Sequence, residues 1–430
     1  MHPLARAPYA AAVSAARFAA HLVPRGAQGK WWRSLGARRG VVARYAAWAS
    51  SQRDDRRPLL WMHAPSVGEG LQARAVLPLL RQRHPALQIA YTFFSPSAAA
   101  FAQSVGADFA DYLPFDSAAD ARAVLHALRP TALVFSKLDV WPLLVEEAAR
   151  RGVRVGMISA TMSEGSGRTS RIASLLLSDA YAALDAVGAI DAGDAGRLTA
   201  LGVRRDRIAV TGDTRYDQVW QRATAADRGG ALLAPLASAR PTLVAGSTWP
   251  ADEAALLDAW GVVRERIPAA RLVIAPHEPT ARAMRPIEAW AREARLTCAR
   301  LGGDAQRTAD VIVVDRVGVL GDLYALADVA FVGGGFHDAG LHSVIEPAAF
   351  GAPVLFGPRH ERSRDAGLLL AQGGAFACAD ARELGARLLA WFSEREARAA
   401  AGRRARSLVE SGIGAAERSA ALVEALLATS

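Results

Sequence analysis

Short apolar runs alternate with segments that carry apolar residues at helical spacing. Runs such as "PLLWMHA" and "LQIAYTF" are separated by "LQARAVLPLLRQRHP". Short apolar runs predict buried strands, and apolar residues recurring at i, i+3 and i+4 predict amphipathic helices. The first half of the chain therefore predicts six strands, at 58–64, 87–93, 131–137, 153–159, 184–190 and 206–213.

This alternation pauses once and then resumes. The segment 222–240 is rich in Ala and Gly and contains no clear strand. Beyond it, five further strands are predicted at 241–247, 270–276, 310–315, 327–335 and 352–358, and two helices at about 380–411 and 414–428. Repeated strand–helix–strand alternation builds a parallel sheet covered by helices on both faces. We expect an α/β fold of two Rossmann-like doubly wound domains, 51–225 and 226–430, that face a cleft.

The first 50 residues depart from the alternation. The segment Ala7–Pro24 is Ala-rich, contains Arg17, and is shorter than the roughly 20 apolar residues of a spanning helix. A basic aromatic stretch follows, with Trp31, Trp32, Arg33, Arg38, Arg39 and Arg44. Such residues suit the headgroup layer of a membrane. We expect 1–50 to be a membrane-associating segment, with a helix packed on the protein or a cleaved signal peptide as alternatives.

Composition narrows the class of protein. The chain has 430 residues, of which 51% are hydrophobic, enough for two domains. Two Cys residues exclude a disulfide framework and a Cys-rich zinc site, and fit a reducing compartment. The net charge is +9 and comes almost entirely from Arg, since Lys occurs only at Lys30 and Lys137. A basic surface favours an anionic membrane or a charged sugar donor. Nucleic acid is a poor candidate partner, because no recognition motif or aromatic stacking platform is present.

Polar residues follow the predicted strands of the first half. In open α/β sheets, ligands bind beyond the carboxyl ends of the strands. "SVGEG" places Ser66, Gly68 and the carboxylate of Glu69 in the turn between a strand and a helix. Further candidates for this site are Arg74 on that helix, Ser95 in "FFSPSA", Lys137 and Asp139 in "SKLDVWP", and Arg215 in "TGDTRYD". A local ion pair between Lys137 and Asp139, and ordinary surface arginines, are the alternatives.

Small and polar residues also end the strands of the second half. In "AGSTW", Ser247 and Thr248 either cap the following helix or let a phosphate approach its N–H groups. In "APHEPTAR", His277 lies beside Glu278 at the end of the next strand. A histidine and a carboxylate at a predicted strand end are candidates for a ligand site.

The stretch "FVGGGFHDAGLHSVIEP" is the most informative of the second half. Gly334 and Gly335 end a strand, His342 follows, and Ser343 is expected to begin a helix with Glu346 in its first turn. Glu346 could accept hydrogen bonds from a ribose diol, or be an acid favoured by the helix dipole. The spacing matches neither a P-loop nor G-x-G-x-x-G, so a nucleotide site of another kind is indicated.

In this order, the motifs resemble those of the bacterial 3-deoxy-D-manno-octulosonic acid (Kdo) transferases. The matching blocks are "HAPSVGEG", "FFSPSA", "YLPFD", "SKLDVWP", "TGDTRYDQV", "GSTWPADE", "APHEP" and "VIEPAAFGAPVLFGP". The resemblance implies a GT-B glycosyltransferase that transfers Kdo with inversion and has no bound metal or other cofactor. It implies CMP-Kdo as the donor and a lipid A precursor as the acceptor. The site of action would be the cytoplasmic face of the cell inner membrane, reached through a membrane-associating N-terminal helix.

The resemblance also implies roles for residues. Glu69 would be the general base, accepting the proton of the acceptor hydroxyl as its oxygen attacks the anomeric carbon. The positions that would contact CMP are Pro276, His277, Val317, Gly318, Val319, Ser343, Val344, Ile345 and Glu346. "KLDVW" stands where the family commonly has Glu-x-Glu-x-Trp. The alternatives are another nucleotide-sugar transferase or an epimerase on the same scaffold, or a non-catalytic membrane-bound homologue.

Overall fold

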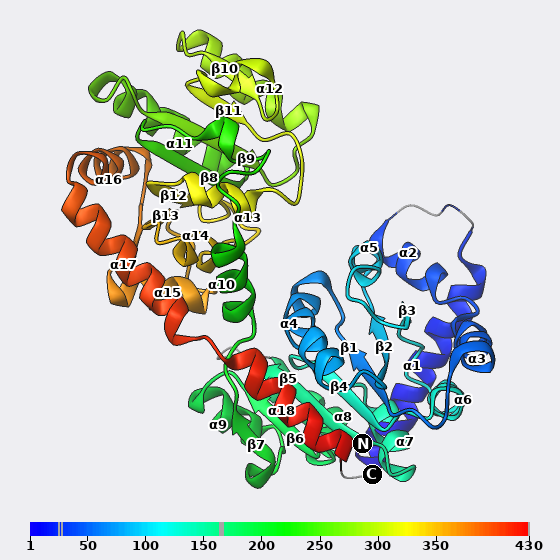
Figure 1. The fold of residues 1–430 in the computed structure, drawn as a ribbon. Coiled ribbons are helices and arrows are strands. Elements are labelled where there is room, and N and C mark those ends of the chain that lie inside the picture. Colours follow the sequence, from blue (N-terminus) through cyan, green and yellow to red (C-terminus); the bar gives the residue numbers. More distant parts are fainter. Residues whose placement is uncertain (25, 27–28, 163–166, 429–430) are drawn as a thin grey trace. The chain divides into compact units, whose positions relative to one another are not determined.

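The chain forms two compact units, each built on its own sheet. The computed structural model describes residues 1–24, 26, 29–162 and 167–428. Within them, one unit comprises Met1–Gln218 with Gly414–Ser430, and the other comprises Val219–Ile413 (Figure 1). Each unit contains a seven-stranded parallel sheet with helices packed on it. The predicted class, two doubly wound α/β domains, is confirmed.

The first sheet has the strand order β3-β2-β1-β4-β5-β6-β7. Its strands are β1 (Leu59–His63), β2 (Gln88–Phe93), β3 (Phe109–Tyr112), β4 (Ala132–Ser136), β5 (Arg154–Ala160), β6 (Ala186–Ala189) and β7 (Ile208–Val210). Its helices are α1 (Pro3–Leu22), α2 (Lys30–Ala37), α3 (Val41–Gln52), α4 (Val67–Arg83), α5 (Ala98–Ala102), α6 (Ala118–Leu128), α7 (Pro142–Arg150), α8 (Arg171–Ala182), α9 (Ala192–Ala200) and α18 (Ala415–Ala428). The chain leaves this unit within α10 (Arg215–Ala225).

The second sheet has the order β10-β11-β9-β8-β12-β13-β14. Its strands are β8 (Thr242–Thr248), β9 (Arg271–Pro276), β10 (Cys298–Arg300), β11 (Val311–Val313), β12 (Val329–Val332), β13 (Val354–Phe356) and β14 (Ala375–Ala377). Its helices are α11 (Pro250–Arg266), α12 (Ala281–Glu293), α13 (Leu320–Leu323), α14 (Ile345–Ala349), α15 (Arg364–Gln372), α16 (Ala381–Ser393) and α17 (Arg395–Ser411).

Each sheet has a topological switch point, where neighbouring strands send their connections in opposite directions. In the first sheet this point lies between β1 and β4, and in the second between β8 and β12. Ligands of open α/β sheets bind at such points, beyond the carboxyl ends of the strands. The turns after β1 and β4 begin at Ala64 and Lys137, and those after β8 and β12 begin at Trp249 and Gly333.

Among the residues that the structure describes, the eleven strands predicted from apolar runs are present, and three further strands were not predicted. The missed strands are β3, β10 and β14, and all three lie at sheet edges. Central strands are buried on both faces and read as continuous apolar runs, whereas an edge strand such as β3 carries polar residues like Asp111. The sequence therefore marks the centre of each sheet more strongly than its edges.

The C-terminal helices differ from the prediction in two ways. The single helix expected over 380–411 is two helices, α16 and α17, separated at Glu394, whose backbone is not helical (φ −101°, ψ 81°). No Gly or Pro marks this break, so the sequence pattern did not reveal it. The last helix, α18, was expected in the second domain and instead packs on the first sheet. A Cβ on Gly156 of β5 would lie 2.4 Å from Leu426, which shows how closely α18 approaches.

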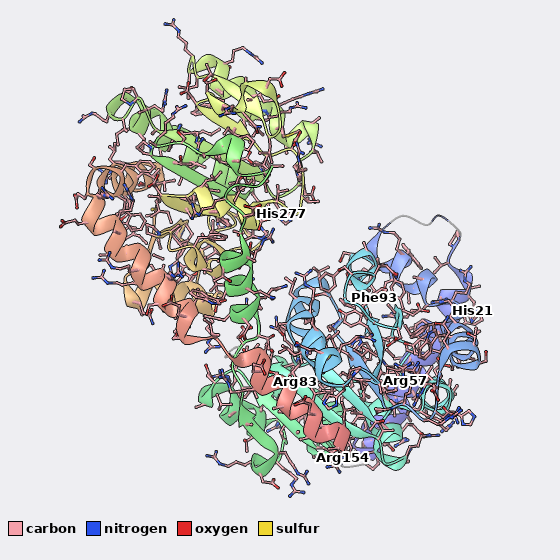
Figure 2. The ribbon with its side chains drawn as sticks, in the orientation of Figure 1. His21, Arg57, Arg83, Phe93, Arg154 and His277 are labelled. Atoms are coloured by element: carbon pink, nitrogen blue, oxygen red, sulfur yellow. The ribbon has the colours of Figure 1, made fainter. Side chains whose placement is uncertain are left out.

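Ion pairs add to this contact. Arg83, labelled in Figure 2, pairs with Glu417 and Glu424 of α18, and His84 Nε2 lies 3.0 Å from Glu424. Backbone N–H groups at Gly414 and Ala416 donate to the Asp217 carboxylate at 2.7 and 2.8 Å. The carboxylate of Asp217 therefore links the segment by which the chain leaves the first unit to the segment by which it returns, at Gly414.

The first 50 residues belong to the first unit rather than to a separate segment. Val41, Tyr45 and Trp48 of α3 are buried in its core. Three of the cations that were assigned to a membrane surface are engaged within the protein: Arg38 donates to Leu113 O, Arg39 to Ala20 O and Val23 O, and Arg44 to Asp111. Packing and internal hydrogen bonds therefore account for these three arginines.

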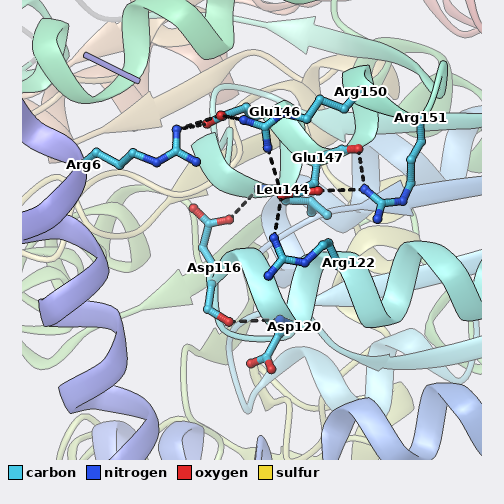
Figure 3. Close-up of polar contacts among 10 residues, drawn as sticks. Arg6, Asp116, Asp120, Arg122, Leu144, Glu146, Glu147, Arg150 and Arg151 are labelled. Atoms are coloured by element: carbon cyan, nitrogen blue, oxygen red, sulfur yellow. Dashed lines mark hydrogen bonds and ion pairs between the residues drawn. The ribbon is translucent and has the colours of Figure 1, made fainter. Parts of the chain in front are cut away.

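Helix α1 is fixed along one face and exposed along the other. Arg6 pairs with Glu146 of α7 at 2.7 Å (Figure 3), Tyr9 donates to Asp116 at 2.7 Å, and Arg17 lies 3.1 Å from Asp120. The opposite face carries Leu4, Pro8, Ala11, Ala15, Phe18 and Leu22, all of them exposed. Among the described residues, no helix combines the length and apolarity needed to cross a bilayer.

Candidate functional site

The carboxylate of Glu69 lies in the first turn of α4, directly after the buried strand β1. Ser66 is the N-cap residue of this helix, and its hydroxyl donates to Glu69 Oε2. The hydroxyl of Ser136, at the end of β4, donates to the backbone oxygen of Glu69 at 2.9 Å. An acid in the first turn is favoured by the helix dipole. Here the N-cap serine also holds its side chain, and strand β4 holds its backbone.

Glu69 lines a pocket of about 250 Å³ at the switch point of the first sheet. The other lining residues are Pro65, Ser136, Lys137, Leu138, Asp139, Thr161, Met162 and Arg168. Lys137 Nζ lies 3.6 Å from Glu69 Oε1, and Arg168 Nη2 lies 2.5 Å from Asp139 Oδ1. The pocket therefore contains two carboxylates, each paired with a cation from another turn. The alternative of a local pair between Lys137 and Asp139 is wrong.

Two glycines of the "VGEGL" turn have different roles. A Cβ on Gly70 would lie 2.5 Å from Phe101 Cε1 and 2.6 Å from Tyr91 Oη, so Gly70 allows α4 to pack on its neighbours. A Cβ on Gly68 would meet only Ser66 Oγ, at 3.7 Å, and this residue is exposed. Burial, and then the charge of Glu69, raise the pKa of Tyr91, which keeps this neighbouring phenol neutral.

Of the eight residues proposed for this site, three line the pocket: Glu69, Lys137 and Asp139. Ser66 and Gly68 belong to the turn that carries Glu69, and the other three lie elsewhere in the first unit. Ser95 is buried, with its hydroxyl 2.8 Å from that of Ser97.

The two candidate arginines are engaged elsewhere in the first unit. Arg74 stacks on Phe101 at 5.2 Å, and Arg215 holds Asp213 through contacts of 2.6–3.1 Å. Sequence reasoning missed Arg168, because it follows no strand and only tertiary packing brings it to Asp139.

In the second unit, four aromatic rings gather where β8 and β9 end. The indole of Trp249 stacks on His277 at 4.6 Å and on His337 at 4.8 Å, and His277 stacks on His342 at 4.5 Å. Trp249 Nε1 lies 3.2 Å from His342 Nε2. An indole N–H only donates, so His342 Nε2 must accept and the ring carries its proton on Nδ1. Burial, and then His277, lower the pKa of His342, which favours this neutral form.

A buried carboxylate joins the two turns of the second switch point. Asp252, on α11, is fully buried and accepts backbone N–H groups of Trp249 at 3.0 Å, Gly334 at 2.7 Å and Phe336 at 2.9 Å. It therefore fixes the glycine loop after β12 to the turn after β8. Neither Trp249 nor Asp252 was a sequence candidate, although both lie in the quoted "GSTWPADE" block.

The glycine loop needs glycine for close approach. A Cβ on Gly333 would lie 2.3 Å from Ser247 O, and one on Gly335 would lie 2.4 Å from Gly357 N. Gly334 has φ +97°, and a Cβ there would lie 2.1 Å from Gly340 O. Side chains would separate these backbones, so the loop's shape depends on all three glycines.

Two expected helix starts were wrong. The N-cap of α11 is Trp249, not Ser247 or Thr248; Ser247 has φ +54°, and the Thr248 hydroxyl donates to Glu253 at 2.9 Å. Helix α14 begins at Ile345, not at Ser343, although Glu346 does lie in its first turn. The start of each helix depends on side-chain contacts that the local pattern does not show.

Glu346 is half-buried beside a cation. Burial raises the pKa of Glu346, while Arg222 and the Ser343 side chain lower it. Arg222 pairs with Asp322 at 2.8 Å and donates to Gly318 O at 2.9 Å, which places the turn 317–319 in the same neighbourhood.

The remaining donor candidates differ in exposure. Val317 is 77% exposed, and Glu278 is also exposed, whereas Pro276, Val344 and Ile345 are buried, so only their backbones are available to a ligand. Within the described residues, no group of three or more His, Cys, Asp or Glu side chains is arranged to hold a metal ion.

Comparisons with known proteins agree with this architecture. A solved structure of UDP-GlcNAc 2-epimerase from Neisseria meningitidis, bound to UDP-GlcNAc, has a similar GT-B-type fold, with a TM-score of 0.63. The match covers 87% of this chain and 100% of that chain at 13% identity, so it concerns the fold alone.

Sequence comparisons are more specific. Residues 33–218 match the family profile described as 3-Deoxy-D-manno-octulosonic-acid transferase (kdotransferase). The 3-deoxy-D-manno-octulosonic acid transferase of Bordetella pertussis is 30% identical over 335 residues, covering 75% of this chain and 77% of that protein. The protein of the same name from Chlamydophila psittaci is 29% identical over 377 residues, covering 84% and 81% of the two chains. The chain therefore belongs to the 3-deoxy-D-manno-octulosonic acid transferases, a family of glycosyltransferases.

Proposed function

We propose that the protein transfers Kdo from CMP-Kdo to a hydroxyl of a lipid A precursor, with inversion at the anomeric carbon and with Glu69 as the general base. The observation that carries the proposal is the carboxylate of Glu69. Its side chain is 21% exposed and lines a pocket at a switch point, in a chain of the Kdo transferase family. A base must reach the proton that it removes, and a carboxylate on a pocket wall meets that condition.

The reaction needs one proton acceptor and one leaving group. The acceptor hydroxyl oxygen bonds to the anomeric carbon as the bond from that carbon to the CMP phosphate oxygen breaks. CMP leaves with the electron pair, and the hydroxyl proton passes to Glu69. Attack on the face opposite the leaving group inverts the configuration. No step of this displacement needs a residue to form a covalent intermediate.

The second unit is the proposed donor site. We propose that Glu346 accepts hydrogen bonds from the ribose and that the exposed imidazole of His277 contacts the nucleotide. His342 presents an Nδ1–H, because Trp249 occupies its Nε2. We propose that this N–H, together with backbone N–H groups near Ser247 and Gly335, binds the phosphate.

The defining experiment is incubation with CMP-Kdo and a lipid A precursor, followed by mass measurement of the lipid. We expect the lipid to gain Kdo units, and CMP to raise the unfolding temperature of the protein more than UDP does. An unmodified lipid, combined with protection by UDP and not by CMP, would favour an epimerase or another nucleotide-sugar enzyme on this scaffold.

The exposed face of α1 supports docking on an anionic membrane at the cytoplasmic face of the inner membrane. Leu4, Phe18 and Leu22 on this face are 79%, 67% and 66% exposed, and Trp31 and Trp32 of α2 are 77% and 51% exposed. The ion pairs of the opposite face hold α1 on the protein, so the apolar stripe is presented to the surroundings. Isolated exposed apolar residues are common, whereas a stripe along one helix beside two exposed indoles is typical of an interfacial helix.

Replacing Phe18 and Leu22 together by Ser is expected to weaken vesicle binding at least about tenfold, because burying each side chain contributes up to about 1.5–3 kcal/mol. Cosedimentation with vesicles of phosphatidylglycerol and phosphatidylethanolamine measures this. Val262→Ser, at a 49% exposed residue of α11, is the matched control and should bind as the wild type does. Equal binding by the double variant would exclude α1 as the docking face.

A further inference from the structure

Both carboxylate oxygens of Glu69 already have a partner in the pocket. Oε2 accepts the hydroxyl of Ser66, and Oε1 faces the ammonium of Lys137 at 3.6 Å. A cation beside a carboxylate favours its charged form, so the ammonium of Lys137 weakens Glu69 as an acceptor for the proton of an incoming hydroxyl. Ser66 is the N-cap residue of the helix that carries Glu69, so the helix fixes these two residues relative to each other. Lys137 comes from another strand and its side chain is 35% exposed, so it is the partner that can leave.

The choice of lysine at this position is unusual for this chain. Lys30 and Lys137 are the only lysines among 51 Lys and Arg residues, so composition favours Arg at a cationic position. The two side chains differ physically, because a guanidinium locks onto a carboxylate through two N–H groups, whereas an ammonium is a compact charge that changes partners easily.

The same pocket shows the contrast. Arg168 is held by Asp139 at 2.5 Å, by Leu138 O at 3.0 Å and by Tyr181 Oη at 3.4 Å. For Lys137, the contact with Glu69 is longer, and within the described part of the chain Glu69 is the carboxylate paired with it. Of the two cations in the pocket, Lys137 is therefore the one able to exchange its partner.

The backbone at Lys137 is also specialised. Its φ is +64°, in the left-handed region that costs a residue with a Cβ about 1–2 kcal/mol. Pairing between β4 and β5 maintains this conformation, since Lys137 N–H donates to Ile158 O at 3.0 Å. Strained residues concentrate at functional sites, and this one carries the side chain that meets Glu69.

We propose that Lys137 is a specificity-determining residue that exchanges Glu69 for an anionic group, phosphate or carboxylate, on the acceptor sugar. The exchange moves the ammonium away from Glu69, which makes the carboxylate a stronger acceptor for the hydroxyl proton. A neutral acceptor leaves Lys137 on Glu69 and reacts slowly even when bound, so the selection appears in kcat. This inference rests on the proposed Kdo transfer and adds to it a selection for an acidic acceptor.

The kinetic test compares the wild type with Lys137→Met and Lys137→Arg on two acceptors, the phosphorylated lipid A precursor and the same lipid after dephosphorylation. For the wild type, we expect kcat on the phosphorylated lipid to exceed kcat on the other at least about tenfold. In Lys137→Met this ratio should fall to within about twofold, because no cation then weakens Glu69 as a proton acceptor with either lipid. Lys137→Arg should lower kcat on both acceptors, because its guanidinium holds Glu69 through two bonds. Lys30→Met is the matched control and should keep the wild-type ratio.

Two results would overturn the inference. In the first, Lys137→Met keeps the wild-type ratio of kcat on the phosphorylated and dephosphorylated lipids. In the second, Lys137→Met loses activity equally on both lipids but still binds CMP as the wild type does. A third acceptor, dephosphorylated but already bearing one Kdo carboxylate, separates the two anion sources. If the wild type regains its high kcat on this third acceptor, the carboxylate is the group that binds Lys137. If kcat stays low, the phosphate is that group.

A spectroscopic measurement tests the exchange without turnover. In NMR spectra of protein labelled with ¹³C,¹⁵N-lysine, only Lys30 and Lys137 give side-chain signals. The signal that is absent from the spectrum of Lys137→Arg belongs to Lys137. Inorganic phosphate should shift the Lys137 side-chain signal and leave that of Lys30 unchanged, and Glu69→Gln should shift it without phosphate. A Lys137 signal that responds to neither change would contradict the exchange. If the wild type transfers no Kdo, the proposed function fails, and this measurement shows separately whether Lys137 binds an anion.

Discussion

Replacing Glu69 by Gln is expected to lower kcat by about 10²–10⁴-fold, the usual contribution of a general base. The amide has nearly the size of the carboxylate, so Ser66 retains an acceptor and α4 keeps its start. What the variant loses is the ability to take a proton. Donor binding should survive, because the donor residues belong to the second unit. Transfer assays with saturating lipid, and calorimetric titration with CMP, measure the two quantities.

Glu146→Gln is the matched control for this substitution. Glu146 belongs to the same unit, has a side chain 22% exposed against 21% for Glu69, and pairs with Arg6 at 2.7 Å. Loss of a comparable ion pair away from the pocket should leave kcat within about twofold of the wild type in detergent. A Glu69→Gln enzyme with normal turnover would remove Glu69 from the mechanism.

The second large effect is expected at Asp252. Replacement by Ala removes the acceptor of three N–H groups, that of Gly334 in a buried contact and those of Trp249 and Phe336 in partly buried ones. Each unsatisfied group costs about 1–3 kcal/mol, so the free energy of unfolding should fall by about 3 kcal/mol or more. The glycine loop and the Trp249 turn would also lose their connection, so the affinity for CMP should fall at least about tenfold. Denaturant unfolding and calorimetric titration measure these effects.

The control for Asp252 lies on the same helix. Asp258→Ala removes an exposed carboxylate of α11 and should change neither quantity appreciably. Asp252→Asn should lie between the two, because its amide oxygen can accept only part of the hydrogen bonds. If Asp252→Ala unfolds as the wild type does, the three hydrogen bonds do not hold the turns together.

Local pattern predicted the centre of each sheet and the places where chemistry could lie. Strands buried on both faces read as continuous apolar runs, and residues such as Glu69 and His277 were found because they directly follow such runs. The edge strands β3, β10 and β14 were not predicted because they lack this pattern. The break between α16 and α17 at Glu394 was not predicted because neither Gly nor Pro marks it. Asp252 was not identified as a site residue, because an acid in the first turn of a helix is ordinarily explained by the helix dipole.

The sequence by itself determined the α/β class, the family and the position of the proposed base, since each depends on residues close together along the chain. Only the tertiary structure decided that β1 lies beside β4, which brings Lys137 to Glu69, and that Arg168 takes Asp139. It alone showed that Asp252 accepts from Gly334, 82 residues away, and that α18 completes the first unit. The order of the strands and the packing of α18 on the first sheet depend on long-range contacts among many similar apolar faces. The local spacing of apolar residues does not specify which of these faces pack together.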